Sequence, residues 1–258
     1  MGSVLVVFSG GIDSALVLRV ATDVLGERAV GLTAVGPALA VRERQAAKRI
    51  AAEIGARHVF VESAEIDDPG YRANAGDRCW YCKSELYRIT AREREALGLT
   101  WVANGTNTDD LGDHRPGLAA ADEARVRSPL VEAGVGKDDV RAIARELGMT
   151  VWDKPASACL ASRIPYGTEV DPVVLAQIDR AELAVKALGY AVLRVRHYGS
   201  LGRVELPEDG LHGLTPMRRA AIVSAVTAAG YAAVEIADEP FRSGSLNASF
   251  TKRLAVAT

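Results

Sequence analysis

Residues 4–14 of the chain read VLVVFSGGIDS. The apolar run at 4–8 is typical of a buried strand, the two glycines are typical of a tight turn, and the apolar residues 15–18 predict a helix. The glycines let the backbone bend closely around a ligand, and the N–H groups at the start of the helix face the loop. An ordinary glycine turn with a serine cap would give part of this pattern, and no Gly-Lys-Ser/Thr follows to make it a Walker A motif. The stretch therefore predicts a strand, an anion-binding loop without a lysine, and a helix.

Length and composition are those of a globular protein. The 258 residues suffice for one large or two modest domains, and 48% of them are hydrophobic. No apolar stretch approaches the roughly 20 residues needed to span a bilayer. Because the first apolar run begins at residue 4, we expect no signal or transit peptide and a cytoplasmic location. The net charge of −2 and the pI of about 6.1 argue against a broad basic surface for nucleic acid.

Strand and helix patterns alternate through the first 150 residues. Strands are predicted at 4–8, 29–34, 58–62 and 101–104, and helices at about 14–25, 41–54, 82–97 and 137–147. This alternation predicts an α/β fold, a parallel sheet with helices on both faces that binds ligands at the carboxyl ends of its strands. The stretch 106–127 reads as a long irregular loop.

A second irregular stretch, 148–170, contains prolines and the third cysteine and is the candidate domain boundary. We therefore predict an ATP-binding domain over 1–165 and a smaller C-terminal α+β domain over 166–258. In the second domain, helices are predicted at about 172–188 and 215–229, and strands at 192–195, 203–206 and 234–236.

Two groups of polar residues are placed to contact a nucleotide. Asp13 directly precedes the predicted helix, where a carboxylate can cap N–H groups or hold Mg²⁺ against phosphates, and the two roles can coexist. The run Asn104-Gly105-Thr106-Asn107, followed by Asp109 and Asp110, ends the fourth predicted strand. It is either a polar turn or part of the ligand crevice.

The three cysteines cannot all pair within the chain, and two of them form Cys79-Trp80-Tyr81-Cys82. In a reducing compartment a Cys-x-x-Cys pair favours a metal or redox role, with two half-buried thiols at a helix start as the alternative. Structural zinc normally takes four ligands, and no second Cys-x-x-Cys or nearby His pair is present. With Cys159 as the third thiolate, a [4Fe–4S] cluster with one open iron suits the set better.

Cys159 lies in residues 154–163, KPASACLASR. Lys154 and Arg163 can lower the pKa of a neighbouring thiol and make it a nucleophile, and a buried structural cysteine is the alternative. Ser162 and Arg163 supply donors for an anionic substrate.

Arg194 and Arg196 alternate along a predicted strand and therefore share one face of it. Paired guanidinium groups suit a phosphate or a carboxylate, and a solvated outer face explains the pattern equally well.

Taken together, these segments resemble the ATP-dependent sacrificial sulfur transferases of the LarE family. This family belongs to the pyrophosphate-loop group, whose members cleave ATP between the α and β phosphates. The resemblance covers nearly the whole chain, and its matching segments are Ser9–Ser14, 78–83, Asn104–Asn107, 154–167, 194–198 and 242–247.

The resemblance implies an enzyme that helps to make the nickel-pincer nucleotide, which is the cofactor of lactate racemase and related enzymes. Its implied substrate is a pyridinium-dicarboxylate mononucleotide. ATP would adenylate a ring carboxylate, a sulfur nucleophile would displace AMP, and sulfur would stay on the substrate as a thiocarboxylate. In the single-cysteine form, the residue that matches Cys159 gives up its own sulfur and becomes dehydroalanine. The additional Cys79 and Cys82 resemble a subtype with a [4Fe–4S] cluster, in which a sulfide on the open iron would be donated.

From the residues and the resemblance together, we expect ATP, Mg²⁺ and a [4Fe–4S] cluster as cofactors. The expected partners are a small-molecule nucleotide and further copies of the chain in a homo-oligomer, with no nucleic acid and no membrane. The expected ATP contacts are Ser9, Gly10, Gly11, Asp13, Ser14, Thr33, Gly105, Thr106 and Asn107. The expected substrate contacts are Ser162, Arg163, Arg194 and Arg196, the catalytic residues Cys159 and Asp13, and the cluster ligands Cys79, Cys82 and Cys159.

Three other functions share part of this pattern. A tRNA thiolase shares the loop and often the cysteines, but its RNA substrate favours a basic surface. An ammonia-dependent amidating ligase of the NAD synthetase type shares the loop and has no need of the cysteines. A nucleotide-binding regulator without catalysis would release no pyrophosphate.

Overall fold

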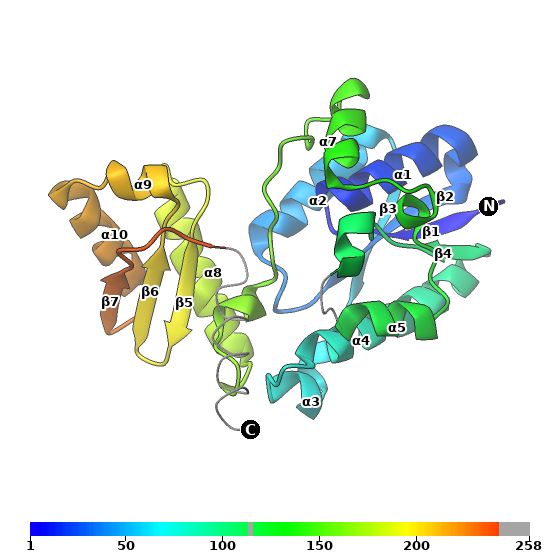
Figure 1. Ribbon diagram of the computed structural model, residues 1–258. Helices are drawn as coiled ribbons and strands as arrows, with labels where there is room; N and C mark the ends of the chain where they lie inside the picture. Colours follow the sequence, from blue (N-terminus) through cyan, green and yellow to red (C-terminus); the bar gives the residue numbers. More distant parts are fainter. Residues whose placement is uncertain (113–115, 243–258) are drawn as a thin grey trace. The chain divides into compact units, whose positions relative to one another are not determined.

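The computed structural model of the protein describes residues 1–112 and 116–242 (Figure 1). The chain forms two compact units, the first made of Met1–Tyr71 and Asp77–Ser157 and the second of Arg72–Gly76 and the residues from Ala158 onward. The division at residue 157 precedes the boundary predicted at 165. The short segment Arg72–Gly76 joins the second unit because the buried Asn74 amide donates to the carbonyl oxygens of Pro165 and Thr168, at 2.9 and 2.8 Å.

The first unit is built on a four-stranded parallel sheet with the strand order β3-β2-β1-β4. The strands are β1 (Val4–Val7), β2 (Ala29–Val35), β3 (Arg57–Glu62) and β4 (Trp101–Ala103). All four strands run in the same direction, so the loops that follow β1 and β4 leave the same edge of the sheet. The predicted α/β class is confirmed.

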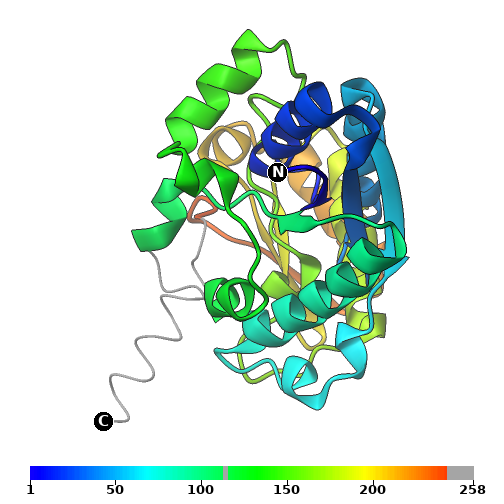
Figure 2. The same ribbon diagram turned by 90° about the vertical axis from the view of Figure 1, so that its right-hand side faces the viewer.

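Helices cover both faces of this sheet, because side chains alternate along each strand (Figures 1 and 2). On one face, Val4, Val6 and Phe8 pack in one core with residues of three helices. These helices are α1 (Ile12–Leu25), α2 (Val41–Ile54) and α7 (Lys137–Glu146). On the other face, Leu5 packs with residues of β2 and of α4 (Arg78–Ala96).

The predicted irregular stretch 106–127 contains helix α5 (Pro116–Glu123), whose Ala120 and Ala121 pack against Tyr87 of α4. This helix was not predicted, because the Gly, Asp, Arg and Pro residues around the two alanines are typical of a loop. Further short elements are α3 (Pro69–Arg72), α6 (Pro129–Glu132) and 3₁₀ turns at Gly26–Arg28, Glu65–Asp67 and Thr108–Gly112. No helix of the described part of the chain has the length and apolar character needed to cross a bilayer.

The second unit contains a three-stranded mixed sheet in which β5 pairs antiparallel with β6, and β6 pairs parallel with β7. Leu193, Val195 and Val204 form its core with residues of two helices. Its elements are a 3₁₀ turn (Leu160–Arg163), α8 (Pro172–Ala187), β5 (Arg194–Tyr198), β6 (Leu201–Glu205), α9 (Glu208–His212), α10 (Pro216–Ala228) and β7 (Ala233–Ile236). The strand predicted at 192–195 lies further along because its pairing with β6 continues to the turn after Tyr198.

Candidate functional site

The Ser9–Ser14 loop connects β1 directly to α1 and is fixed from within. Gly10 has φ +70°, and a Cβ atom there would lie 2.9 Å from the Cα atom of Ala47, so only glycine fits. The Ser14 hydroxyl donates to the Gly11 carbonyl at 3.1 Å and accepts from the Ser9 N–H at 3.2 Å. Gly11 is the N-cap of α1 and has no side chain to occupy the N–H groups of the first turn. The loop is therefore preorganised, with helix N–H groups for an anion.

The loop that follows β4 packs against the start of α1. A Cβ atom on Gly105 would lie 2.6 Å from the Ser14 backbone nitrogen, so the two backbones touch. The buried Asn104 side chain holds this loop in shape, since its Oδ1 accepts from the Thr106 N–H and from the Ser128 hydroxyl, both at 3.0 Å. The predicted ATP contacts on the two loops are thus neighbours at one edge of the sheet.

Asp13 lies in the first turn of α1, because the helix begins at Ile12 and not after Asp13 as the sequence suggested. The N-cap position belongs to Gly11, so the expected capping role of Asp13 is wrong. The Asp13 carboxylate instead accepts from Lys137 Nζ, at 2.8 Å on Oδ1 and 2.6 Å on Oδ2. Its Oδ1 also accepts from the Asn107 side-chain amide at 3.0 Å. The Asp13 side chain remains 24% exposed, so the carboxylate is held in place and still reaches solvent.

Two lysines border the loop, although the loop itself contains none. Lys137 begins α7, and its backbone N–H donates to Asp109 Oδ2 at 2.6 Å. Lys154 Nζ donates to the Gly10 carbonyl at 2.9 Å and pairs with Glu43 at 2.8 Å. Sequence reasoning missed Lys137, which it took only as part of a helix start, and considered Lys154 only as a neighbour of Cys159. Both ammonium groups bring positive charge to the predicted phosphate site.

Thr33 lies in β2 and is buried, with 2% of the residue exposed. Its hydroxyl donates to the Phe8 carbonyl, and His58 Nε2 lies 2.8 Å from the same oxygen. Burial lowers the pKa of His58, so a neutral imidazole faces Thr33. The hydroxyl thus joins the end of β1 to β2, and contact of Thr33 with ATP stays a prediction.

The three cysteines lie on two elements of different units. Cys79 and Cys82 lie near the start of α4, three residues apart and hence on neighbouring positions of one helix face. Cys159 is exposed and directly precedes the 3₁₀ turn Leu160–Arg163 of the second unit. Among residues 1–112 and 116–242, no three His, Cys, Asp or Glu side chains form a group that could hold a metal ion. The [4Fe–4S] cluster therefore stays a prediction.

Arg163 fixes the loop that carries Cys159. Its guanidinium is buried and forms a two-pronged ion pair with Glu182 of α8, at 2.8 and 3.0 Å. Its Nη1 also donates to the carbonyl oxygens of Ala158 and Cys159, at 2.6 and 2.9 Å, and to the Ser162 hydroxyl at 3.0 Å. Glu182 in turn accepts from the Val195 N–H at 3.1 Å, which ties the cysteine loop to β5.

Arg194 and Arg196 are buried, so they do not form a solvated outer face. Arg196 pairs with Glu205 at 2.9 Å and donates to the Ser162 carbonyl at 2.7 Å, which makes it a second support of the cysteine loop. The Arg194 guanidinium lies over the Phe241 ring at 4.8 Å. Burial, together with the nearby charge of Arg163, lowers the pKa of Arg194 to about 10. Substrate contact by these arginines stays a prediction, and of the matching segment 242–247 only Arg242 lies within the described residues.

Comparison with known proteins adds three relatives, while no protein-family model matches the chain. An uncharacterized protein of Synechocystis is 42% identical over 249 residues, which span 96% of this chain and 93% of the relative. A pyridinium-3,5-bisthiocarboxylic acid mononucleotide synthase of Lactiplantibacillus plantarum is 36% identical over 250 residues, 96% of this chain and 90% of the relative. An uncharacterized protein of Methanocaldococcus jannaschii is 33% identical over 136 residues, 53% of each chain.

Replacing Arg163 by Met tests the support of the cysteine loop. The substitution leaves the Glu182 carboxylate buried without its counter-ion, which costs about 3–5 kcal/mol of unfolding free energy. The matched control is Arg72→Met, which removes the exposed pair with Glu169 in the same unit and changes stability by about 0.5 kcal/mol or less. Urea unfolding followed by circular dichroism measures the unfolding free energy of both variants. Equally small losses of unfolding free energy in the two variants would contradict a stabilising role of the buried Arg163–Glu182 ion pair.

Proposed function

The chain belongs to the family of the Lactiplantibacillus plantarum pyridinium-3,5-bisthiocarboxylic acid mononucleotide synthase, and from this we propose that it is an ATP-dependent sulfur transferase. Its proposed substrate is a pyridinium-dicarboxylate mononucleotide, and its proposed product is the corresponding thiocarboxylate. This product would serve the biosynthesis of a nickel-pincer nucleotide. Assembly into a homo-oligomer is part of the proposal on the family resemblance alone.

The observation that supports the proposal most directly is the set of groups that contact the Asp13 carboxylate. This carboxylate belongs to the Ser9–Ser14 loop and is held by Lys137 and Asn107 beside the N–H groups at the start of α1. Hard divalent cations prefer carboxylate oxygen, and phosphates prefer ammonium groups and helix N-termini. The donor set therefore fits Mg²⁺ and the phosphates of ATP, with Asp13 toward the metal and Lys137 and Lys154 toward the phosphates. Bound Mg²⁺ would supply neutralising charge to the pyrophosphate that leaves.

The first proposed step is adenylation. A carboxylate oxygen of the substrate forms a bond to the α phosphorus of ATP, and the bond from that phosphorus to the bridging oxygen breaks. Pyrophosphate leaves with the electron pair, and the loop N–H groups and the two lysines stabilise its charge. The substrate carboxylate, a poor electrophile, thereby becomes an acyl adenylate.

The second proposed step transfers sulfur. The Cys159 thiolate attacks the acyl carbon, a C–S bond forms, and AMP leaves with the electrons of the C–O bond. The Cα proton of Cys159 then passes to water, the Cβ–Sγ bond breaks, and the thiocarboxylate leaves. Cys159 remains as dehydroalanine. Arg163 and Arg196 act here as positioning residues through their hydrogen bonds to the loop.

A cluster-bound sulfide is the other proposed sulfur source. It is supported by the presence of Cys79, Cys82 and Cys159, none of which forms a disulfide, and by the family subtype that three cysteines resemble. Because the described residues contain no group of three metal ligands, we derive no step through a cluster.

Replacing Asp13 by Asn should lower pyrophosphate release in the presence of the nucleotide substrate by about 100-fold or more. The side chain keeps its size but loses the charge that Mg²⁺ requires. The matched control is Asp23→Asn, which changes an exposed carboxylate at the other end of the same helix and should leave the rate unaltered. Pyrophosphate is measured by a coupled assay and the thiocarboxylate by mass spectrometry. Wild-type turnover in Asp13→Asn would contradict the role of Asp13 in holding Mg²⁺. Pyrophosphate release that required tRNA or ammonia would indicate a tRNA thiolase or an amidating ligase instead of the proposed sulfur transferase.

The two sulfur sources predict different properties of the purified protein. A cluster predicts brown protein after anaerobic purification, about four irons per chain, and loss of colour when any one cysteine is replaced by Ser. Donation by Cys159 predicts colourless protein that loses about 34 Da at this residue after one turnover. Absorption spectra, iron analysis and peptide mass spectrometry measure these outcomes. Absence of both the colour and the mass loss would contradict both sources.

A further inference from the structure

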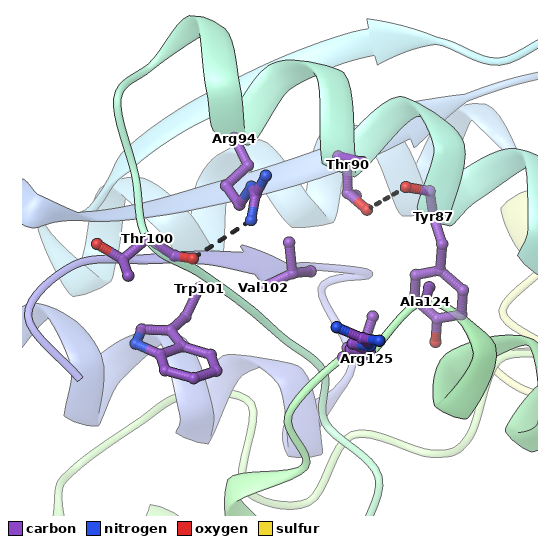
Figure 3. Close-up of a pocket in the computed structure, with 10 residues that line it drawn as sticks. Tyr87, Thr90, Arg94, Thr100, Trp101, Val102, Ala124 and Arg125 are labelled. Carbon is purple, nitrogen blue, oxygen red and sulfur yellow. Dashed lines mark hydrogen bonds between the residues drawn. The ribbon is translucent and has the colours of Figure 1, made fainter.

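A pocket of about 270 Å³ lies in the first unit, beside the start of β4 (Figure 3). Its walls come from α4, from the start of β4 and from the residues that follow α5. Tyr87 and Trp101 provide aromatic surface, and Arg94 and Arg125 provide positive charge. No acidic side chain lines it, and none of its residues belongs to the site proposed for ATP.

Arg125 occupies a backbone position that favours glycine. It lies two residues after the end of α5 and has φ +52°, in the left-handed region. Its N–H bonds the Asp122 carbonyl, and the next N–H bonds the Ala121 carbonyl, both at 3.0 Å, which is the helix ending that usually carries glycine. An arginine here is strained, and its side chain lines the pocket. Strained positions of this kind are concentrated at functional sites.

Arg94 faces the same pocket from α4 with its hydrogen bonds incompletely used. Its Nη1 donates to the Thr100 carbonyl at the long distance of 3.4 Å, as Figure 3 shows, and its Nη2 contacts the exposed Glu95 at 3.1 Å. Its Nε is buried, and the described residues place no acceptor within hydrogen-bonding distance of it. An unsatisfied buried donor is costly, and an anion in the pocket would give it an acceptor after a small rotation of the guanidinium.

The third arginine near the pocket, Arg127, is already neutralised. It lies over the Trp101 ring at 5.1 Å and pairs with Glu132. Arg127 also does not line the pocket, whereas Arg94 and Arg125 do, and the carboxylate paired with Arg94 belongs to the exposed Glu95. Arg94 and Arg125 are therefore the groups for a ligand.

We propose that this pocket binds a small aromatic anion, a single ring that carries a carboxylate or a phosphate monoester. Arg94 and Arg125 bind the anionic group, and Tyr87, Trp101 and Val102 contact the ring. The volume accommodates one ring with its acidic substituent. Because the pocket shares no residue with the Asp13 site, this inference stands independently of the proposed sulfur transfer.

The test titrates the full-length protein with phenyl phosphate and with benzoate, and measures binding by calorimetry and by tryptophan fluorescence. Comparison of the two probes identifies the preferred acidic group, while phenol and inorganic phosphate test the need for the charge and for the ring. Wild-type protein should bind at least one aromatic anion about tenfold or more tightly than phenol and than inorganic phosphate. Failure of both aromatic anions to bind, or equal binding of inorganic phosphate, would overturn the proposal.

Arg125→Gly separates ligand binding from structure, because its two expected effects have opposite signs. Glycine relieves the strain and should raise the unfolding temperature, while the loss of the guanidinium should weaken binding about tenfold or more. Arg94→Gln should weaken binding to a similar degree, and Arg49→Gln, an exposed arginine of α2, should leave it unchanged. Unchanged affinity in Arg125→Gly would contradict a role of Arg125 in ligand binding, and a lowered unfolding temperature would contradict the strain that singles this residue out.

Discussion

The ion pair between Asp13 and Lys137, completed by the amide of Asn107, joins three segments that are distant in the sequence. It links the first turn of α1, the loop after β4 and the start of α7. Each partner is itself placed by the backbone, since Gly105 touches the start of α1 and Asp109 accepts from the Lys137 N–H. A carboxylate held in this way cannot turn away from the loop. In the proposed function, Mg²⁺ would take the place of Lys137 on the carboxylate, and the Lys137 ammonium would then be available to the phosphates.

The second unit applies a comparable principle to a cysteine. Cys159 is exposed, but the carbonyl oxygens around it are fixed by Arg163 and Arg196, whose charges are balanced by Glu182 and Glu205. Buried ion pairs are costly unless both partners are well bonded, and here each one also supports backbone. Arg163 and Arg196, which sequence reasoning assigned to the substrate, thus hold the loop first, and any contact with substrate comes in addition.

Local patterns were sufficient for the α/β fold and for the two loops at the edge of the sheet. The apolar run 4–8 and the Ser9–Ser14 loop specify β1, the turn and α1, and parallel strands then bring Asn104 and Gly105 to the same edge. Patterns were insufficient where one side chain decides. The Asn74 amide binds its segment to the second unit by donating to two carbonyl oxygens, and Lys137 donates to Asp13, which is distant from it in the sequence. Neither contact produces a periodic pattern in the sequence. The burial of Arg194 depends on the exact bounds and pairing of β5, which a short stretch of sequence does not define.

The proposed sulfur transfer depends on one earlier step, in which ATP is cleaved between its α and β phosphates to activate a carboxylate. Exchange of labelled pyrophosphate into ATP measures this step directly, in wild-type protein and in Cys159→Ala. We expect exchange that requires both Mg²⁺ and the pyridinium-dicarboxylate mononucleotide and that persists in Cys159→Ala, because adenylation precedes attack by sulfur. Release of ADP, or absence of exchange with the complete substrate set, would contradict it.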